Sequence, residues 1–124
     1  MSPFYLLATL FVAASVSATA LAQTDTVINA ENIQRVPVAP ALVELAWSAK
    51  QQAVFVTSPD WEDEKGSSAL RLEPKTLAIK ATIPLAVKGF GVALDDSNNR
   101  LYLTEGFNGA VGVVDTARKQ SLAT

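Results

Sequence analysis

The feature that most constrains this chain is an internal repeat in its last two thirds. Sliding the sequence by 47 positions places Val54-Phe55-Val56-Thr57 over Leu101-Tyr102-Leu103-Thr104. Further along each unit the offset becomes 42, which places Leu72-Glu73-Pro74 over Val114-Asp115-Thr116. The five-residue difference falls within 58–66, so the first unit is expected to carry a longer loop there. A chain that repeats at this interval folds as similar units packed against one another.

Each unit contains four short apolar runs that are separated by polar turns. The runs have the length of strands, with Val, Ile, Phe and Thr well represented, and this texture predicts no helix. Strands are expected at Leu42–Trp47, Ala53–Thr57, Ala69–Leu72, Leu77–Ile83, Phe90–Leu94, Leu101–Thr104, Ala110–Val114 and from Gln120 onward. A repeat of about 40–50 residues with four strands is typical of a β-propeller blade. The sequence therefore predicts an all-β fold of two four-stranded antiparallel blades, 42–89 and 90–124.

The amino-terminal segment has a different character. No charged residue precedes Asp25, and the apolar run that begins at Phe4 ends in small residues one and three positions before Gln23. We interpret 1–22 as an apolar signal helix that is cleaved after Ala22 and directs the chain to the periplasm or out of the cell. A retained membrane anchor is the alternative, because the run approaches the length of about 20 apolar residues that spans a bilayer. Residues 23–41 are expected to form an extended lead-in to the first blade.

Composition excludes several kinds of chemistry. The chain has no His and no Cys, so it cannot form a Ser-His-Asp or Cys-His nucleophile, a thiolate metal site or a disulfide. Its 10 Lys and Arg against 12 Asp and Glu leave a formal net charge of -2, and the basic residues are scattered singly. This distribution argues against a nucleic-acid partner. We expect neither a cofactor nor a metal.

Two segments of the second unit carry a family resemblance. Leu101-Tyr102-Leu103-Thr104-Glu105 and Val113-Val114-Asp115-Thr116-Ala117 resemble the "YVTN" and "VIDT" motifs of YVTN-type β-propellers. In addition, 70–77 and Lys88-Gly89-Phe90-Gly91 are similar to the first blades of the YncE-like periplasmic propeller proteins. The resemblance covers 42–124 and departs from the pattern at Glu105, where the motif has Asn, and at Gly89, a place often held by Pro.

The resemblance implies a seven-bladed ring, and propellers in general need about 4–8 blades to close. Two blades therefore predict an N-terminal fragment, with a self-assembling half-propeller as the alternative. The function implied is that of an exported binding or scaffold module without catalytic activity. Two alternatives stay open: a propeller lactonase or hydrolase that uses carboxylates and an oxygen-ligated metal, and single-stranded DNA binding.

Antiparallel strands return the chain to the same end at every second connection. The connections 58–66, 84–89 and 105–109 should therefore share one face, on which an unidentified protein or small molecule binds. The candidate binding residues on this face are Trp61, Lys88, Glu105, Phe107 and Asn108. Trp61 has no counterpart in the other unit, which favours an exposed functional aromatic.

Other conspicuous residues receive structural interpretations. Phe55 and Tyr102 occupy matching repeat positions and Trp47 aligns with Leu94, so all three are expected to pack in the core. The Asp95–Asn99 stretch is expected to form a β-turn and not a calcium loop. Asn108-Gly109 is expected to form a type I′ hairpin turn and not a phosphate loop, because a strand follows it.

Overall fold

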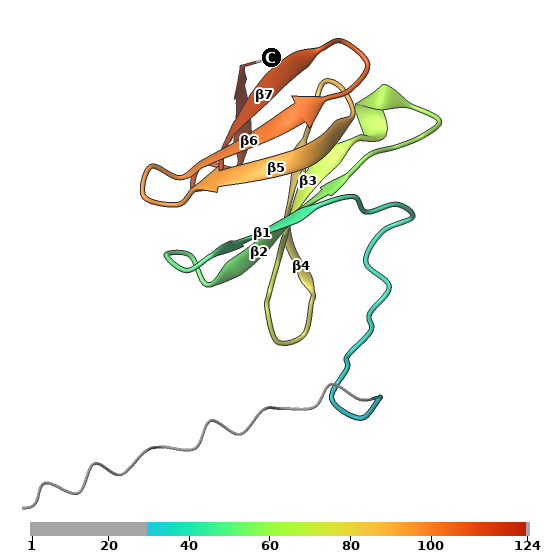
Figure 1. The fold of residues 1–124 in the computed structure, drawn as a ribbon, viewed down its shortest axis with the longest axis vertical. Helices are drawn as coiled ribbons and strands as arrows, with labels where there is room; N and C mark the ends of the chain where they lie inside the picture. The colour runs from blue at the N-terminus through green and yellow to red at the C-terminus, as the bar shows by residue number, and fades with distance from the viewer. Residues whose placement is uncertain (1–29, 124) are drawn as a thin grey trace, which may run out of the picture. The chain divides into compact units, whose positions relative to one another are not determined.

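A computed structural model describes residues 30–123 of the chain (Figure 1). The signal peptide expected at 1–22 and the first part of the lead-in lie outside the described residues. The chain divides into two units, 1–34 and Arg35–Thr124. Of the first unit only 30–34 are described, and they contain a turn; every strand belongs to the second unit. No helix among the described residues is long and apolar enough to cross a membrane.

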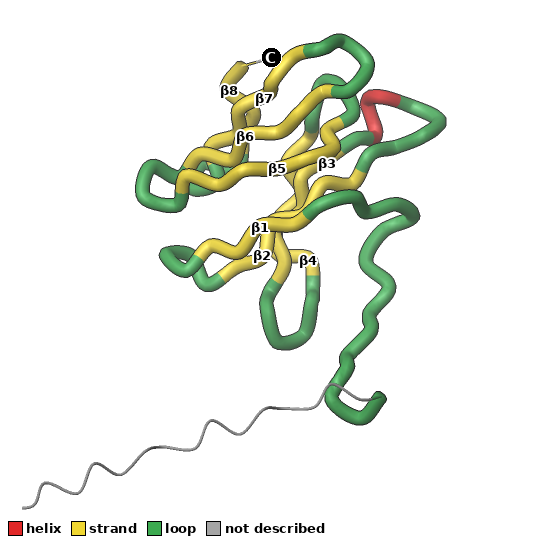
Figure 2. The backbone as a smooth tube through the Cα atoms, in the orientation of Figure 1, coloured by secondary structure: helices red, strands yellow, loops and turns green. Residues whose placement is uncertain are grey.

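The second unit consists of two four-stranded antiparallel sheets, which confirms the predicted all-β fold (Figure 2). In the first sheet, which we call blade 1, the strands lie in sequence order: β1 (Leu45–Ser48), β2 (Ala53–Ser58), β3 (Ser68–Leu72) and β4 (Ile79–Pro84). Blade 2 has the same order: β5 (Gly89–Asp95), β6 (Arg100–Glu105), β7 (Ala110–Asp115) and β8 (Gln120–Ala123). The one helical turn among the described residues, η1 (Glu64–Gly66), lies in the connection between β2 and β3.

The pairing of strands repeats between the blades at the offsets read from the sequence. Ala46 faces Phe55 in blade 1, and Ala93 faces Tyr102 in blade 2. Both blades also have a register shift at the same point, between Arg71 and Leu72 and between Val113 and Val114. The connection 59–67 in blade 1 corresponds to the shorter 106–109 in blade 2, so the predicted insertion lies where the offset changes.

The main hydrophobic core lies between the two blades. Phe55, Ala69 and Ile83 of blade 1 pack with Leu101 and Val114 of blade 2, and all five are fully buried. The Thr57 hydroxyl, also fully buried, donates across this interface to the Phe90 carbonyl oxygen at 2.7 Å. Apolar burial on the facing sides of two sheets thus holds the blades together.

The core prediction is wrong for two of the three aromatic residues. Trp47 is 47% exposed and Tyr102 is 39% exposed, whereas Phe55 is buried as expected. Side chains alternate between the two faces of a strand, so Tyr102, the register partner of Ala93, lies on the side of blade 2 that faces away from the core between the blades. Trp47 lies on the outer side of blade 1.

The lead-in covers part of that outer side of blade 1. Val38 and Ala39 pack against a second buried cluster formed by Val56, Leu70 and Leu72. The described residues before Leu45 contain neither helix nor strand, so the first strand begins three residues later than the predicted Leu42. The residues just before β1 already run alongside β2, because the Val43 amide donates to the Thr57 carbonyl oxygen at 3.1 Å.

The tight hairpin turns share one feature of backbone conformation. In each four-residue hairpin turn within a blade the last residue has a positive φ: Gln52, Asn99, Gly109 and Lys119. The predicted type I′ turn at Asn108-Gly109 is wrong, because that turn type needs positive φ at both positions and only Gly109 has it, at 67°. Gly109 still serves the role of supplying a left-handed residue without steric cost.

Candidate functional site

Three connections meet at one end of the blades, as the antiparallel topology predicts. They are 59–67, 85–88 and 106–109, and with the strand ends that flank them we call them the loop face. The first and third lie together at the upper right of Figure 1. Lys88 of the second connection lies 4.0 Å from Glu64 of the first and 5.8 Å from the ring centre of Phe107 in the third. The loop face therefore joins residues from both blades in one surface.

An aromatic row crosses the loop face. The Phe90 ring lies between Trp61, at 5.8 Å between ring centres, and Phe107, at 5.7 Å in an edge-to-face arrangement. The two outer rings are open to solvent, with Trp61 57% exposed and Phe107 72% exposed. Edge-to-face contacts orient aromatic rings, so Phe90 helps to fix the exposed Phe107 ring, and it contacts Trp61 at a tilt of 47°.

A small cavity lies beside this row. Its volume is about 100 Å³, and its walls are Glu64, Val87, Lys88, Glu105, Phe107 and Asn108. The Lys88 side chain is only 11% exposed, and within residues 30–123 its ammonium group makes no hydrogen bond. Four of the five predicted binding residues line this one cavity, and the fifth, Trp61, lies on the aromatic row next to it.

Glu105 is the most buried charged residue of the loop face, at 3% exposure. Its Oε2 accepts a hydrogen bond of 2.8 Å from the Asn108 amide nitrogen. Gly112 makes room for the other oxygen, because a Cβ there would lie 2.7 Å from Oε1. Within the described residues Oε1 has no hydrogen-bond donor, and the Glu105 side chain is one wall of the cavity.

The inserted connection 59–67 is organised by its own carboxylates. Asp60 accepts hydrogen bonds from the amides of Asp63 and Glu62, and these donors hold the pKa of Asp60 below its usual value. Asp63 caps η1 by accepting from the Lys65 amide at 2.9 Å. A second hollow of about 370 Å³ lies beside Trp61 and is lined by Pro40, Ala41, Ser58, Pro59, Asp60, Trp61, Glu62 and Gly66.

The opposite end of the blades carries the hairpin turns 49–52, 73–78, 96–99 and 116–119, which with their flanking strand ends we call the turn face. Two of these turns lie one above the other at the left of Figure 1. Polar side chains join the blades here: Ser48 and the Lys50 amide both donate to the Asp96 carboxylate. The Gln51 amide group donates to Thr116 Oγ1 at 2.6 Å. The sequence indicated the turns but contained no sign of this contact between blades.

Other carboxylates of the turn face stabilise single turns. Asp95 accepts from the Asn98 and Ser97 side chains, which lowers its pKa and confirms the predicted β-turn. The Thr76 hydroxyl and amide lower the pKa of Glu73 in the same way. The Arg118 amide lowers the pKa of Asp115, and Arg100 adds to the effect through an ion pair of 2.9 Å.

The structure adds residues that the sequence did not single out for binding. Phe90, Glu64 and Val87 complete the loop face, and of these only Phe90 carried a signal, since Gly89 and Gly91 flank it. A Cβ on Gly89 would lie 3.1 Å from Leu85. The Gly89 backbone thus lies close to the Leu85 side chain, where a larger residue would be crowded.

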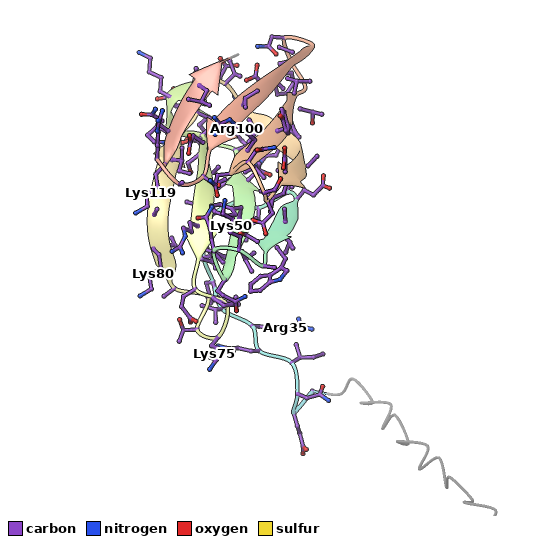
Figure 3. The ribbon with its side chains drawn as sticks, turned by 90° about the vertical axis from the view of Figure 1, so that its left-hand side faces the viewer. Arg35, Lys50, Lys75, Lys80, Arg100 and Lys119 are labelled. Atoms are coloured by element: carbon purple, nitrogen blue, oxygen red, sulfur yellow. The ribbon has the colours of Figure 1, made fainter. Side chains whose placement is uncertain are left out.

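The distribution of acidic and basic side chains bears on metal and nucleic-acid binding. Within residues 30–123 no group of three or more Asp and Glu side chains is placed to hold a metal ion. Arg35, Lys50, Lys75, Lys80, Arg100 and Lys119 are spread along the molecule in Figure 3 and do not gather in a single patch.

The chain is similar to several curated bacterial proteins. It is 32% identical over 96 residues to the Salmonella typhi protein described as "Uncharacterized protein YncE", an alignment that covers 77% of this chain and 27% of the relative. It is 30% identical over 87 residues to the Escherichia coli K12 protein of the same description, covering 69% of this chain and 25% of the relative. The chain thus spans about a quarter of the length of these relatives. It matches no protein-family model.

Proposed function

We propose that the two sheets are neighbouring blades of a YncE-like, YVTN-type β-propeller. The support is the pair-for-pair repetition of strand register between the sheets, together with the similarity to proteins described as YncE. An exported, non-enzymatic binding module is the function that this architecture fits best. The signal peptide expected at 1–22 belongs to this proposal.

The main support for a binding function is a difference between the two faces in whether their polar side chains have partners within the described residues. At the turn face the side chains of Ser48 and Gln51 are bound across the blade interface. At the loop face the buried Glu105 side chain and the Lys88 side chain both line a cavity beside the exposed Phe107 ring. Binding surfaces usually combine exposed aromatic rings with polar groups whose hydrogen-bonding capacity is not used within the protein.

The nucleic-acid alternative gains no support from this surface. The loop face carries the carboxylates of Asp60, Glu62, Asp63, Glu64 and Glu105 against the ammonium groups of Lys65 and Lys88. A phosphate backbone would be repelled by this excess of negative charge. A cationic or neutral partner is compatible with it.

Site-specific photo-cross-linking in intact cells tests the proposal. A photoreactive amino acid replaces Glu62 on the loop face or, as the matched control, Ser97 on the turn face; both positions are exposed. Adducts are expected in the periplasmic fraction from position 62 and not from position 97, and Trp61→Ala should remove them. Equal labelling from both positions, or label confined to the cytoplasm, would contradict the proposal.

A further inference from the structure

Glu105 carries a charge that its described neighbours do not neutralise. A buried carboxylate is costly unless it is paired with a cation or saturated with hydrogen bonds. Glu105 is 3% exposed, yet its one side-chain partner among residues 30–123 is the neutral Asn108 amide. No nitrogen of a described Lys or Arg lies within 4.0 Å of its carboxylate.

The cavity that Glu105 lines has the features of a site for a small organic cation. Two carboxylates, Glu64 and Glu105, and one ammonium group, Lys88, give its walls a formal excess of one negative charge. The exposed ring of Phe107 forms another wall. Aromatic faces attract cations, and Lys88 already lies over this ring at 5.8 Å from its centre.

The size of the cavity limits what can enter. A volume of about 100 Å³ accommodates a guanidinium or ammonium group with a short part of its stem, and not a whole amino acid or nucleotide. The remainder of a longer ligand would lie along the aromatic row toward Trp61. The row extends away from the cavity, so an elongated ligand fits better than a compact one.

We propose that this cavity binds the guanidinium or primary ammonium group of an elongated ligand, with the Glu105 carboxylate as the main acceptor. Glu64 accepts at the rim and Phe107 covers the cation. The source of the cation is an Arg or Lys side chain of a partner peptide or a free polyamine. This inference rests on the proposed function, because it names the ligand chemistry of the same loop face.

The site makes a specific claim about Lys88. For an anionic or neutral ligand Lys88 would be the donor, and its loss would weaken binding. For a cation it is a like charge next to the ligand, so Lys88→Met, which keeps the apolar stem, should strengthen binding by about 3-fold. The sign of this change separates the two ligand classes.

Calorimetric titration of the full chain tests the site. The probes are N-acetyl-arginine amide, its neutral isostere N-acetyl-citrulline amide, and agmatine. The arginine derivative is expected to bind at least about 10-fold more tightly than the citrulline derivative, because a hydrogen bond to a charged group is stronger than one to a neutral group. Comparison of agmatine with the arginine derivative identifies which source of the cation binds more tightly.

Single substitutions test which residues of the cavity contact the cation. Glu105→Gln keeps an acceptor for Asn108 and should weaken the arginine probe about 10-fold, and Phe107→Leu should weaken it about 3-fold. Glu73→Gln, a carboxylate of the opposite turn face, is the matched control and should leave affinity unchanged. Thermal unfolding of each variant verifies that the fold is retained.

Three outcomes would overturn the inference: equal binding of the arginine and citrulline probes, weaker binding in Lys88→Met, or no saturable binding of either cation. If loop-face cross-links at position 62 persist under any of these outcomes, the proposed binding function stands and only the cation site is wrong. If the cross-links are also absent, both proposals fail.

Discussion

At the turn face several polar side chains of one blade bind the other blade, whereas at the loop face most of them bind their own loop. Asp96 holds Ser48 and the Lys50 amide of the neighbouring blade, while Asp60 accepts from amides two and three residues further along its own connection. Contacts between blades resist their separation, and contacts within a loop or turn stabilise that local conformation. The turn face therefore contributes to stability, and the loop face is left free to bind.

Acidification should produce the largest change in stability, and most of it should come from the turn face. Five described carboxylates have a lowered pKa, and four of them, Glu73, Asp95, Asp96 and Asp115, lie on the turn face. A folded pKa below the unfolded value stabilises the fold above the unfolded pKa of about 4, and this contribution is lost as pH falls through the folded value. We expect the free energy of unfolding in urea to fall between pH 7 and pH 3.

A variant isolates the contact between blades within this acid response. The Ser48 hydroxyl is the main cause of the lowered pKa of Asp96. Asp96→Asn should be less stable than the unsubstituted chain at pH 7 and lose less stability on acidification. An unchanged pH profile would show that Asp96 does not contribute to the response.

Removing the Ser48 hydroxyl should give the next largest effect. Ser48 is fully buried, and its hydroxyl donates to Asp96 and accepts from the backbone amide of Gln51 at 3.0 Å. Ser48→Ala leaves these partners unsatisfied and is expected to cost about 1–3 kcal/mol of unfolding free energy. The matched control is Ser97→Ala on the exposed part of the turn face, expected to change stability by less than about 0.5 kcal/mol. Equal effects would remove the distinction between contacts across blades and contacts within a turn.

The turn of the loop face should be sensitive to its glycine. Gly109 has a φ of 67°, and a Cβ there would meet no atom within 4 Å, so backbone strain alone opposes a side chain. Gly109→Ala is expected to destabilise the fold by about 1 kcal/mol in urea unfolding. A neutral result would mean that the 106–109 turn relaxes to another conformation.

The smallest effect is expected at the last turn of the turn face, and it should be stabilising. Lys119 is exposed and has a φ of 59°, a left-handed conformation that costs a non-glycine residue energy. Lys119→Gly should raise the unfolding free energy by about 0.5 kcal/mol, since relief of strain exceeds the added entropy of the unfolded chain. Lys75→Gly, in a turn position without positive φ, is the control and should not stabilise.

Several aspects of the fold and the candidate site could be predicted from local sequence. Strand positions follow from short apolar runs between turn residues, and the repeat offset places equivalent residues in the same register. Antiparallel topology assigns each connection to one end of the blades, and this rule alone places Trp61, Lys88, Glu105, Phe107 and Asn108 on a common face. Their binding role stays a prediction.

The tertiary structure decided which of two equivalent residues is buried. Phe55 and Tyr102 occupy the same repeat position, yet Phe55 is fully buried and Tyr102 is 39% exposed. The sequence determines that both point to the same side of their blade, because side chains alternate along a strand. Burial depends on whether another sheet covers that side, and within the described residues only blade 1 has such a neighbour there.

The same distinction applies to the polar residues. The sequence by itself predicts that a turn begins at Glu105 and another at Ser48, and these residues are the last of β6 and β1. Only the packing of blade against blade decided that the Ser48 hydroxyl reaches Asp96 and that Glu105 is enclosed next to Gly112 at the wall of a cavity. Hydrogen bonds and buried charges join residues far apart in the chain, and their partners are set by distances that a local pattern does not contain.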